Sequence, residues 1–182
     1  ANEAGGFTDQ YEGIRILTVG RLTYQKAYDI AIDAMKLVKQ SGCKARWYVL
    51  GEGNEREKLE KKIKELGLEE DFLLLGAVEN PYPYYAQADL YVHATRFEGK
   101  SIAIQEAQVL GCPVIASDCN GNREQIESGV DGILCKLSPE DIAKCIEELI
   151  ADPKKRQIYA KCARERNKEN KEEINQLLTM MR

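Results

Sequence analysis

Two glutamates, Glu98 and Glu106, flank a short segment whose residue types suit the binding of an anion. The pattern of residues 97–111 predicts a loop that opens into a helix, with Gly111 placed to cap the end of that helix. The backbone N–H groups of residues 99–101 would then lie at a helix N-terminus, where such groups lack intrahelical partners and bind anions. A ligand that combines phosphates with sugar hydroxyls would use both these groups and the two carboxylates.

Glu106 has an unusual position on this predicted helix. A helical wheel places it between Ile102 and Leu110, inside a broad apolar arc. The other members of the arc are Ala103, Ala107 and Val109. A carboxylate on a core-facing surface costs free energy unless it is paired or hydrogen-bonded. Two interpretations stay open: Glu106 serves a ligand, or it lies at the edge of the arc and reaches water or an arginine.

The composition fits one globular domain. The chain has 182 residues and a net charge of −4, which argues against nucleic-acid binding through a general positive field. No apolar run approaches the roughly 20 residues that span a bilayer. The six cysteines form no C-x-x-C pair, so we expect reduced thiols and a cytoplasmic location. A zinc site is disfavoured because His93 is the single histidine.

Buried strands and amphipathic helices alternate along the chain for six rounds. The predicted strands are 14–19, 46–50, 72–75, 90–93, 114–117 and 133–135. The predicted helices are 28–40, 55–66, a short turn near Tyr82, the helix before Gly111, 123–128 and 138–150, followed by a helical segment over 152–182. This alternation predicts an α/β domain with a doubly wound, mostly parallel six-stranded sheet. We expect residues 1–12 to be a linker or an expression remnant and residues 13–182 to form the domain.

The predicted fold indicates where a ligand would bind. In doubly wound sheets the site lies at the carboxyl ends of the strands where the strand order reverses, which is commonly between the first and fourth strands. The loops at that point are residues 21–26 and 96–101. The first loop carries two cations, Arg21 and Lys26, and the second carries Glu98. The two cations either bind an anionic ligand or are solvated surface charges, and the sequence leaves both interpretations open.

These residues resemble the group 1 (family 4) retaining glycosyltransferases of the GT-B fold. The resemblance lies in Gly20-Arg21-Leu22 with Lys26 downstream, in Glu98 and Glu106 with seven residues between them, and in the segment 111–118. It extends from about residue 14 to 165 and covers only the C-terminal half of such an enzyme, so we expect the N-terminal acceptor domain to be absent. The segment from Glu98 to Ser101 is especially similar to the branch that builds bacterial surface polysaccharides.

The resemblance implies a role for each matching residue. Arg21 and Lys26 would hold the diphosphate of a sugar nucleotide and, with Glu98 beside the donor sugar, would form the catalytic set. Glu106 would accept the ribose hydroxyls. The remaining implied donor-binding residues are Gly20, Val78 near the base, and Gly99, Lys100, Ser101 and Ile102 at the diphosphate.

The chain departs from the family pattern at three places. It has Lys26-Ala27 where the family often has Lys-Gly, Gly99-Lys100-Ser101 for Gly-Phe-Gly, and Asn120-Gly121 for Gly-Gly. The second change bears on donor preference, and the third puts any sugar contact from that loop in doubt. The G-x-G of residues 51–53 is interpreted as a tight strand-to-helix turn rather than a dinucleotide fingerprint. The tyrosines at 82, 84, 85 and 91 are interpreted as packing residues.

The expected function is that of a hexosyltransferase-type glycosyltransferase that binds a UDP-, GDP- or ADP-sugar. With its own N-terminal domain it would transfer the sugar with retention in polysaccharide or glycoconjugate synthesis; alone, it would bind donor without efficient turnover. No cofactor and no metal are expected, since no Asp-x-Asp is placed for a divalent ion. The longer enzyme could associate peripherally with the inner face of a membrane. The alternatives are a nucleotide-sugar-binding regulatory module and half of a sugar-nucleotide epimerase.

Overall fold

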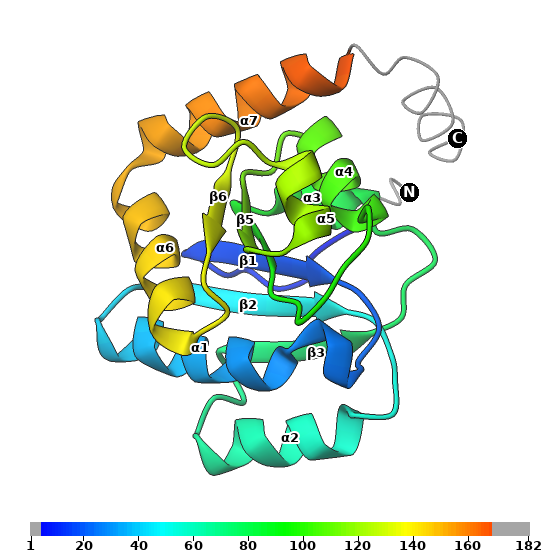
Figure 1. The fold of residues 1–182 in the computed structure, drawn as a ribbon. Coiled ribbons are helices and arrows are strands. Elements are labelled where there is room, and N and C mark those ends of the chain that lie inside the picture. The colour runs from blue at the N-terminus through cyan, green and yellow to red at the C-terminus, as the bar shows by residue number, and fades with distance from the viewer. Residues whose placement is uncertain (1–4, 169–182) are drawn as a thin grey trace.

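The structure is a computed structural model that describes residues 5–168. Its centre is one six-stranded, all-parallel sheet with the strand order β3-β2-β1-β4-β5-β6 (Figure 1). The strands are β1 Ile14–Val19, β2 Ala45–Leu50, β3 Phe72–Gly76, β4 Leu90–His93, β5 Val114–Ser117 and β6 Ile133–Cys135. The predicted doubly wound fold is therefore confirmed, and so is the adjacency of the first and fourth strands, which pair through Ile16 with Leu90 and Leu17 with Tyr91.

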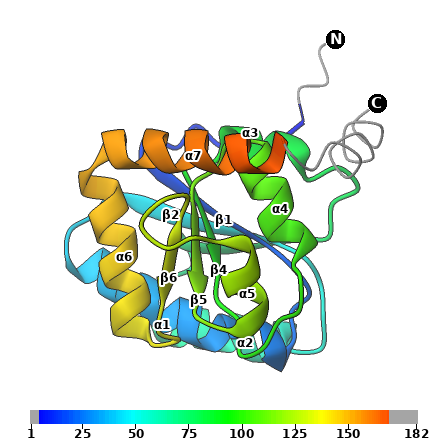
Figure 2. The ribbon, with the colours of Figure 1, turned by 45° about the horizontal axis from the view of Figure 1, so that its top comes forward.

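Helices cover both faces of the sheet. They are η1 Tyr24–Lys26, α1 Tyr28–Gln40, α2 Arg56–Glu65, α3 Tyr82–Gln87, α4 Ile102–Val109, α5 Asn120–Gln125, α6 Pro139–Ala151 and α7 Pro153–Lys168. Figure 1 shows α1 and α2 below the sheet and α3, α4 and α5 above it. Each face has its own apolar cluster, one built with residues of α1, α2 and α6 and the other with residues of α3 and α4. Helix α7 packs across α4 (Figure 2).

Local sequence signals set several element boundaries. Ser138 caps α6 through its hydroxyl, which accepts a hydrogen bond from the Asp141 N–H at 3.2 Å, and Pro139 occupies the first helical position. Gly111 has a φ of 76° just beyond α4, as expected for a residue that caps a helix end. The helix predicted for residues 152–182 is observed as α7 up to Lys168, and its remainder lies outside the described residues.

The helix predicted at 123–128 was placed too late in the sequence. It begins at Asn120, so Asn120-Gly121 forms its first turn rather than a turn before it. A Cβ atom on Gly121 would lie 2.1 Å from the carbonyl oxygen of Gly99. Glycine is thus needed here because α5 starts directly against the backbone of the loop that carries Glu98.

The segment before β1 packs on the domain from residue 5 onward, where the Gly5 carbonyl accepts a hydrogen bond from the Gln87 amide at 3.0 Å. Asp9 forms ion pairs with Arg15 at 2.8 Å and Arg46 at 2.9 Å and accepts a hydrogen bond from the Tyr48 hydroxyl at 2.6 Å. The Phe7 ring lies 4.4 Å from the Tyr48 ring, measured between centroids. The expected domain boundary at residue 13 stays a prediction, but the preceding residues contribute contacts to β1 and β2.

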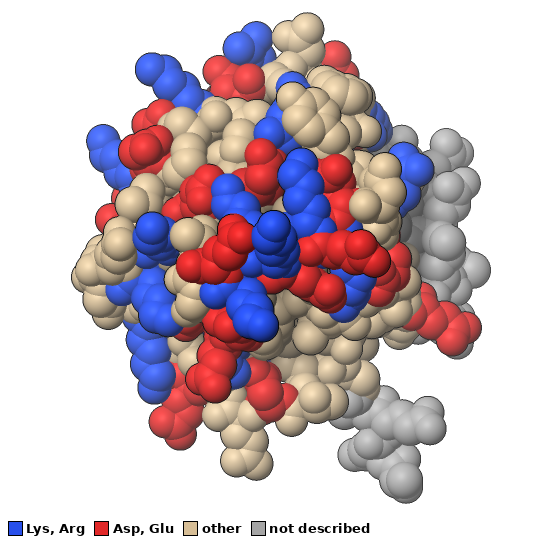
Figure 3. All heavy atoms as spheres, turned by 90° about the horizontal axis from the view of Figure 1, so that it is seen from below, with Lys and Arg blue, Asp and Glu red and all other residues tan. Residues whose placement is uncertain are grey.

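The surface over α1 and α2 carries charges of both signs. Figure 3 shows Lys and Arg side chains interspersed with Asp and Glu on this face. Arg56 pairs with Glu52 at 2.6 Å and with Glu60 at 2.8 Å, and Lys62 pairs with Asp33 at 2.7 Å. Such mixing gives no one-signed field across this face. Within the part of the chain that the structure describes, no helix has the length and apolar character needed to cross a bilayer.

Candidate functional site

The loops that follow β1 and β4 are bonded to each other at the carboxyl ends of these strands. The Arg96 N–H donates to the Gln25 carbonyl at 2.8 Å, and the Thr95 hydroxyl donates to the same carbonyl at 3.0 Å. In return, the Gln25 side-chain amide donates to the Phe97 carbonyl at 2.9 Å. The two loops predicted from the strand order to form the site are therefore neighbours.

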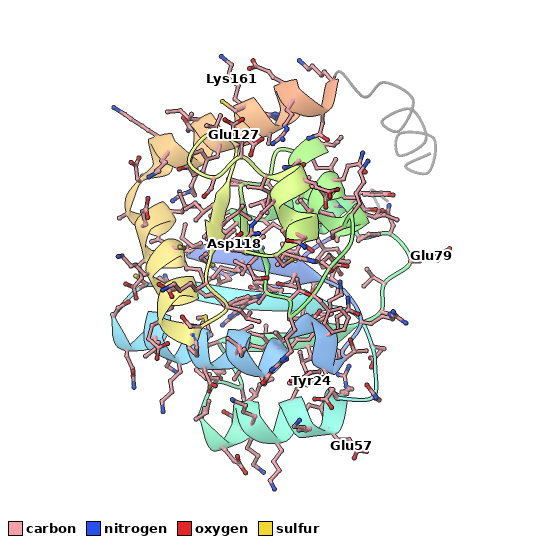
Figure 4. The ribbon with its side chains drawn as sticks, viewed as in Figure 1. Tyr24, Glu57, Glu79, Asp118, Glu127 and Lys161 are labelled. Atoms are coloured by element: carbon pink, nitrogen blue, oxygen red, sulfur yellow. The ribbon has the colours of Figure 1, made fainter. Side chains whose placement is uncertain are left out.

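Arg96 holds the two loops together through contacts with Asp29 and Tyr24. Its guanidinium donates to both carboxylate oxygens of Asp29, at 3.1 and 2.8 Å. It also stacks on Tyr24, with its central carbon 3.9 Å from the ring centroid. Tyr24 is the first residue of η1, just before α1, and is labelled in Figure 4. This role of Arg96 could not be predicted from the sequence, because its partner Asp29 is 67 residues away.

Lys26 and Glu98 form an ion pair across the two loops. Their side chains are only 17% and 12% exposed, so the pair is largely withdrawn from water. Burial opposes ionisation of Glu98, but hydrogen bonds from His93 and Lys26 outweigh it and lower the pKa of Glu98 to about 2. Glu98 is therefore a carboxylate at every physiological pH.

His93 is the third member of this cluster, and the sequence did not single it out as a candidate site residue. It ends β4 and is buried, with Nε2 at 2.9 Å from a Glu98 oxygen and Nδ1 at 3.3 Å from the Tyr91 hydroxyl. Burial lowers the pKa of His93 below its usual value; Glu98 opposes that shift and the nearby Lys26 charge reinforces it. The available signal was its position at the end of a strand at the predicted ligand-binding edge, but only its lack of zinc partners was considered.

Glu106 lies on the other side of the site and has neutral partners. It accepts hydrogen bonds from the Tyr85 hydroxyl at 3.0 Å and the Tyr82 hydroxyl at 3.5 Å, both from α3. Burial raises the pKa of Glu106, and the two hydroxyls counteract only part of this shift. These tyrosines pack in the core as expected, but they also hydrogen-bond the carboxylate.

The apolar arc predicted for the α4 helix is confirmed in part: Ala107 is buried and Ala103 and Leu110 pack against the core, but Ile102 does not. Ile102 is 68% exposed, whereas the helix buries Ile104 and Ala107 together with Gln105 and Gln108. The helix turns polar side chains inward because α5 and α7 offer them partners: Gln108 donates to the carbonyl of Gln125 on α5 at 2.9 Å and accepts from Asn167 on α7 at 3.1 Å. Glu106 is consequently half-buried rather than at the centre of a core-facing stripe.

The start of α4 is held by Ser101 and Gln125. The Ser101 hydroxyl caps the helix by accepting from the Ile104 N–H at 3.3 Å. The buried Gln125 amide accepts from the Ser101 N–H at 2.6 Å and donates to the Ser101 carbonyl at 2.8 Å. The Ser101 N–H is thus occupied in this structure, and the exposed backbone of Gly99 and Lys100 lies just before it.

A cavity of about 380 Å³ opens beside these loops at the carboxyl ends of β1 and β2. Its walls are formed by Val19, Gly20, Arg21, Leu50, Gly51, Glu52, Ala77, Val78 and Pro81. A Cβ atom on Gly20 would lie 3.6 Å from the Lys26 Cε, so Lys26 lies next to one of the residues that line the cavity. Three residues predicted to bind a donor, Gly20, Arg21 and Val78, therefore share one cavity, and Lys26 lies close to it.

The glycines of the 51–53 turn allow backbone segments to approach closely. A Cβ atom on Gly51 would lie 2.0 Å from the Gly20 carbonyl oxygen, and one on Gly53 would lie 2.2 Å from the Leu22 carbonyl oxygen. This packing against the loop after β1 agrees with the interpretation of the G-x-G as a tight turn. In residues 5–168, no three His, Cys, Asp or Glu side chains gather into a group able to hold a metal ion.

Residues 9–166 match the family described as glycosyl transferases, group 1. The chain belongs to this family. This group 1 domain is 34% identical over 155 residues to an N-acetylgalactosamine-N,N'-diacetylbacillosaminyl-diphospho-undecaprenol 4-alpha-N-acetylgalactosaminyltransferase of Campylobacter jejuni, a match that covers 84% of the chain and 42% of the relative. It is 31% identical over 149 residues to the amylovoran biosynthesis glycosyltransferase AmsD of Erwinia amylovora, a match that covers 82% of the chain and 42% of AmsD. The chain thus spans about two fifths of the length of these curated relatives.

Solved structures of group 1 proteins have the same fold. The C-terminal domain of LpcC from Francisella tularensis superposes with a TM-score of 0.75 at 27% identity, covering 86% of this chain and 85% of that one. HepE of Anabaena, solved with UDP and glucose, superposes with a TM-score of 0.81 at 26% identity, covering 92% of this chain and 48% of HepE. The group 1 domain thus has the fold of the C-terminal domains of GT-B enzymes, as the sequence resemblance implied.

Proposed function

We propose that this group 1 domain binds the nucleoside-diphosphate part of a sugar donor. Within a longer enzyme it would serve the transfer of that sugar, with retention, during polysaccharide or glycoconjugate synthesis. One observation supports this most directly: the cavity lined by Arg21 and Val78 adjoins the buried Lys26–Glu98 pair, at the strand ends where α/β folds bind ligands.

The arrangement offers a separate group for each part of such a donor. The cavity beside Val78 suits the base, and Arg21 and Lys26 suit the diphosphate. Pro81 lines the same cavity, and the next residue, Tyr82, contacts Glu106, so a ribose that leaves the cavity on that side would meet a hydroxyl-accepting carboxylate. Glu98 would lie beside the donor sugar.

The chemistry would depend on charge at the leaving phosphate. Cleavage of the sugar–phosphate bond builds negative charge on the departing diphosphate, and cations fixed in advance near that charge lower the barrier. Arg21 and Lys26 would supply those cations, and metal independence stays a prediction. UDP is the first nucleotide to test, because HepE was solved with UDP and with UDP-glucose.

The proposal is tested by calorimetric titration of the domain with UDP, GDP and ADP and with the matching nucleosides. We expect one diphosphate to bind well above its nucleoside. The double variant Arg21→Ala/Lys26→Ala should weaken binding of the diphosphate far more than that of the nucleoside, because charge on the phosphates is what these residues contact. Lys36→Ala, on the exposed side of α1, is the matched control and should bind normally.

Two results would contradict the proposal. One is that no nucleoside diphosphate binds at millimolar concentration. The other is an equal loss for nucleoside and diphosphate in the double variant, which would make Arg21 and Lys26 ordinary surface charges. Comparing donor hydrolysis with and without the missing half of the enzyme would then test the transfer step.

A further inference from the structure

His93 occupies a hydrogen-bonded position that suits both of its protonation states. The Tyr91 hydroxyl beside its Nδ1 also lies 3.2 Å from the Val19 carbonyl oxygen. When His93 is neutral and donates through Nε2 to Glu98, Nδ1 is an acceptor and the Tyr91 hydroxyl can donate to it. When His93 carries a second proton, Nδ1 donates to the Tyr91 oxygen and the same hydroxyl donates to Val19. Both states keep the two ring nitrogens hydrogen-bonded; in the neutral state the Val19 carbonyl, on a half-buried residue that lines the cavity, gives up the Tyr91 hydroxyl.

The two charges closest to His93, the Glu98 carboxylate and the Lys26 ammonium, neutralise each other as long as no other anion binds Lys26. The charged groups that act on His93 are Glu98, from the loop after β4, and Lys26, from η1. Tyr91 lies on β4, the same strand as His93, and its ring contacts that of Tyr85 of α3. Glu106 of α4 and Tyr28 of α1 act electrostatically on the Tyr91 hydroxyl. With the Lys26 charge matched by Glu98, burial keeps the pKa of His93 below its usual value and the ring is neutral near pH 7.

A bound diphosphate would change this balance. It adds about two negative charges and competes with Glu98 for Lys26, so Glu98 keeps His93 as its remaining partner. Negative charge in a site of low dielectric favours the protonated imidazole. The ring nitrogen at 2.9 Å from Glu98 then carries a charge-assisted hydrogen bond that holds the carboxylate in place.

We propose that His93 is the positioning residue for Glu98, and that it takes up a proton when a nucleoside diphosphate sugar binds and draws Lys26 away. This inference rests on the proposed function. The proton comes from solvent, no bond of the donor changes, and the effect of the proton is to keep Glu98 oriented at the donor sugar. His93 itself does not touch the ligand.

The test is calorimetry with UDP-glucose, or with GDP- or ADP-glucose if the domain selects another base. The phosphates of such diesters do not titrate between pH 6 and 8, so any proton exchanged belongs to the protein. Titrations at one pH in buffers of different ionisation enthalpy count the protons. We expect uptake of roughly half a proton or more near pH 6.5, and an affinity that rises about tenfold from pH 8 to pH 6, within the limit of tenfold per unit for one proton.

Two variants separate a positioning role from a structural one. His93→Gln keeps an amide that can donate to Glu98 but does not titrate, so proton uptake and the pH dependence of affinity should disappear. Tyr91→Phe removes the group that accepts from the protonated ring, so it should reduce uptake while the neutral state survives. A wild-type titration without proton uptake overturns the role of His93 even if neither variant folds.

The outcomes distinguish the two proposals. Binding of a nucleotide sugar with no proton uptake overturns the role of His93 and leaves the proposed function intact. Uptake that persists in His93→Gln assigns the proton to another group and also overturns it. Absence of binding by all three sugar nucleotides removes both proposals together.

Discussion

Glu98 and Glu106 are separated by seven residues and are held in opposite ways. Glu98 pairs with Lys26 and His93, and its pKa falls to about 2. Among the described residues, Glu106 accepts hydrogen bonds from the hydroxyls of Tyr82 and Tyr85, and its pKa rises. The same residue type on one short segment thus acquires different electrostatics, because one carboxylate faces a cationic loop and the other faces an aromatic helix.

This contrast indicates how each carboxylate can meet a ligand. Hydroxyl partners are neutral and can be exchanged for sugar hydroxyls with little change in charge, so Glu106 is poised for exchange. Glu98 is bonded to a cation that the proposed diphosphate would claim, so ligand binding must rearrange its partners.

The largest effect is expected from Lys26→Met, which removes the ion pair that holds Glu98. The variant removes the cation from a largely buried pair and leaves Glu98 with His93 alone, so stability should fall by about 2–3 kcal/mol. Adding Glu98→Gln should restore part of this loss, because the uncompensated charge disappears. Urea unfolding of the wild type, both single variants and the double variant measures the coupling, and strictly additive changes would show that the pair is energetically unimportant.

Glu106→Gln probes the other carboxylate. A hydrogen bond to a charged acceptor contributes about 1.5–3 kcal/mol, so loss of the charge should weaken nucleotide binding roughly tenfold. Folding stability should stay within about 0.5 kcal/mol or rise slightly, since a half-buried charge is removed and hydroxyls can accept from an amide. Melting temperature and nucleotide affinity are measured on this variant and on Glu69→Gln, an exposed control in the turn before β3. Falling stability with unchanged affinity would assign Glu106 to the fold.

The stability contributions of Glu98 and Glu106 should change in opposite directions as the pH falls. The folded-state pKa of Glu98, about 2, lies below its ordinary 4.5, so the stabilisation is present above pH 4.5 and is lost as pH falls toward 2. For Glu106 the folded-state pKa is raised, so the ionised carboxylate destabilises the fold at neutral pH and the penalty fades as pH falls through that pKa.

Urea unfolding at pH 7, 5 and 3 makes the comparison. The advantage of the wild type over Glu98→Gln should shrink by about 1 kcal/mol between pH 5 and 3, after allowance for solvent screening. Between pH 7 and 5, the free energy of unfolding of the wild type should rise relative to that of Glu106→Gln. Shifts of the same sign in both comparisons would mean that the two carboxylates have similar surroundings.

The strands and the meeting of the two loops could be predicted from the sequence, because local signals determine them. The run of residues 14–19 is mostly apolar and ends at Gly20, and the topology of a parallel sheet then brings the first and fourth loops together. Residue types at these loops were enough to single out Lys26 and Glu98, although the roles of both stay predictions.

The inward face of α4 and the partners of each carboxylate could not be predicted. Gln105 and Gln108 look like surface residues in sequence and are buried only because α5 and α7 provide partners. The hydroxyls that hold Glu106 come from residues 21 and 24 positions away, and the cation that holds Glu98 comes from 72 positions away. Such pairings depend on tertiary packing, which a single periodicity does not encode.

The smallest effect is expected at Ala27, the residue after Lys26. Among the described residues it is the only non-glycine with a positive φ, at 47°, in the left-handed region that costs about 1–2 kcal/mol for an L-residue. The family resemblance described above implies a glycine at this position. Ala27→Gly should relieve this strain, but it removes a buried methyl group worth about 0.8 kcal/mol and adds freedom to the unfolded chain. Stability should therefore change by less than about 1 kcal/mol.

Ala34→Gly supplies the matched control for Ala27→Gly. Ala34 is equally buried but lies within α1, where no positive φ is relieved, so this variant should lose about 1.5–2 kcal/mol. Urea unfolding of both variants tests the difference, and equal losses would mean that residue 27 carries no strain. Nucleotide affinity of Ala27→Gly should stay within about twofold of the wild type, because glycine retains the turn that directs Lys26 toward Glu98. A large loss of affinity with unchanged stability would instead mean that the alanine methyl group, packed beneath the loop, is what directs that lysine.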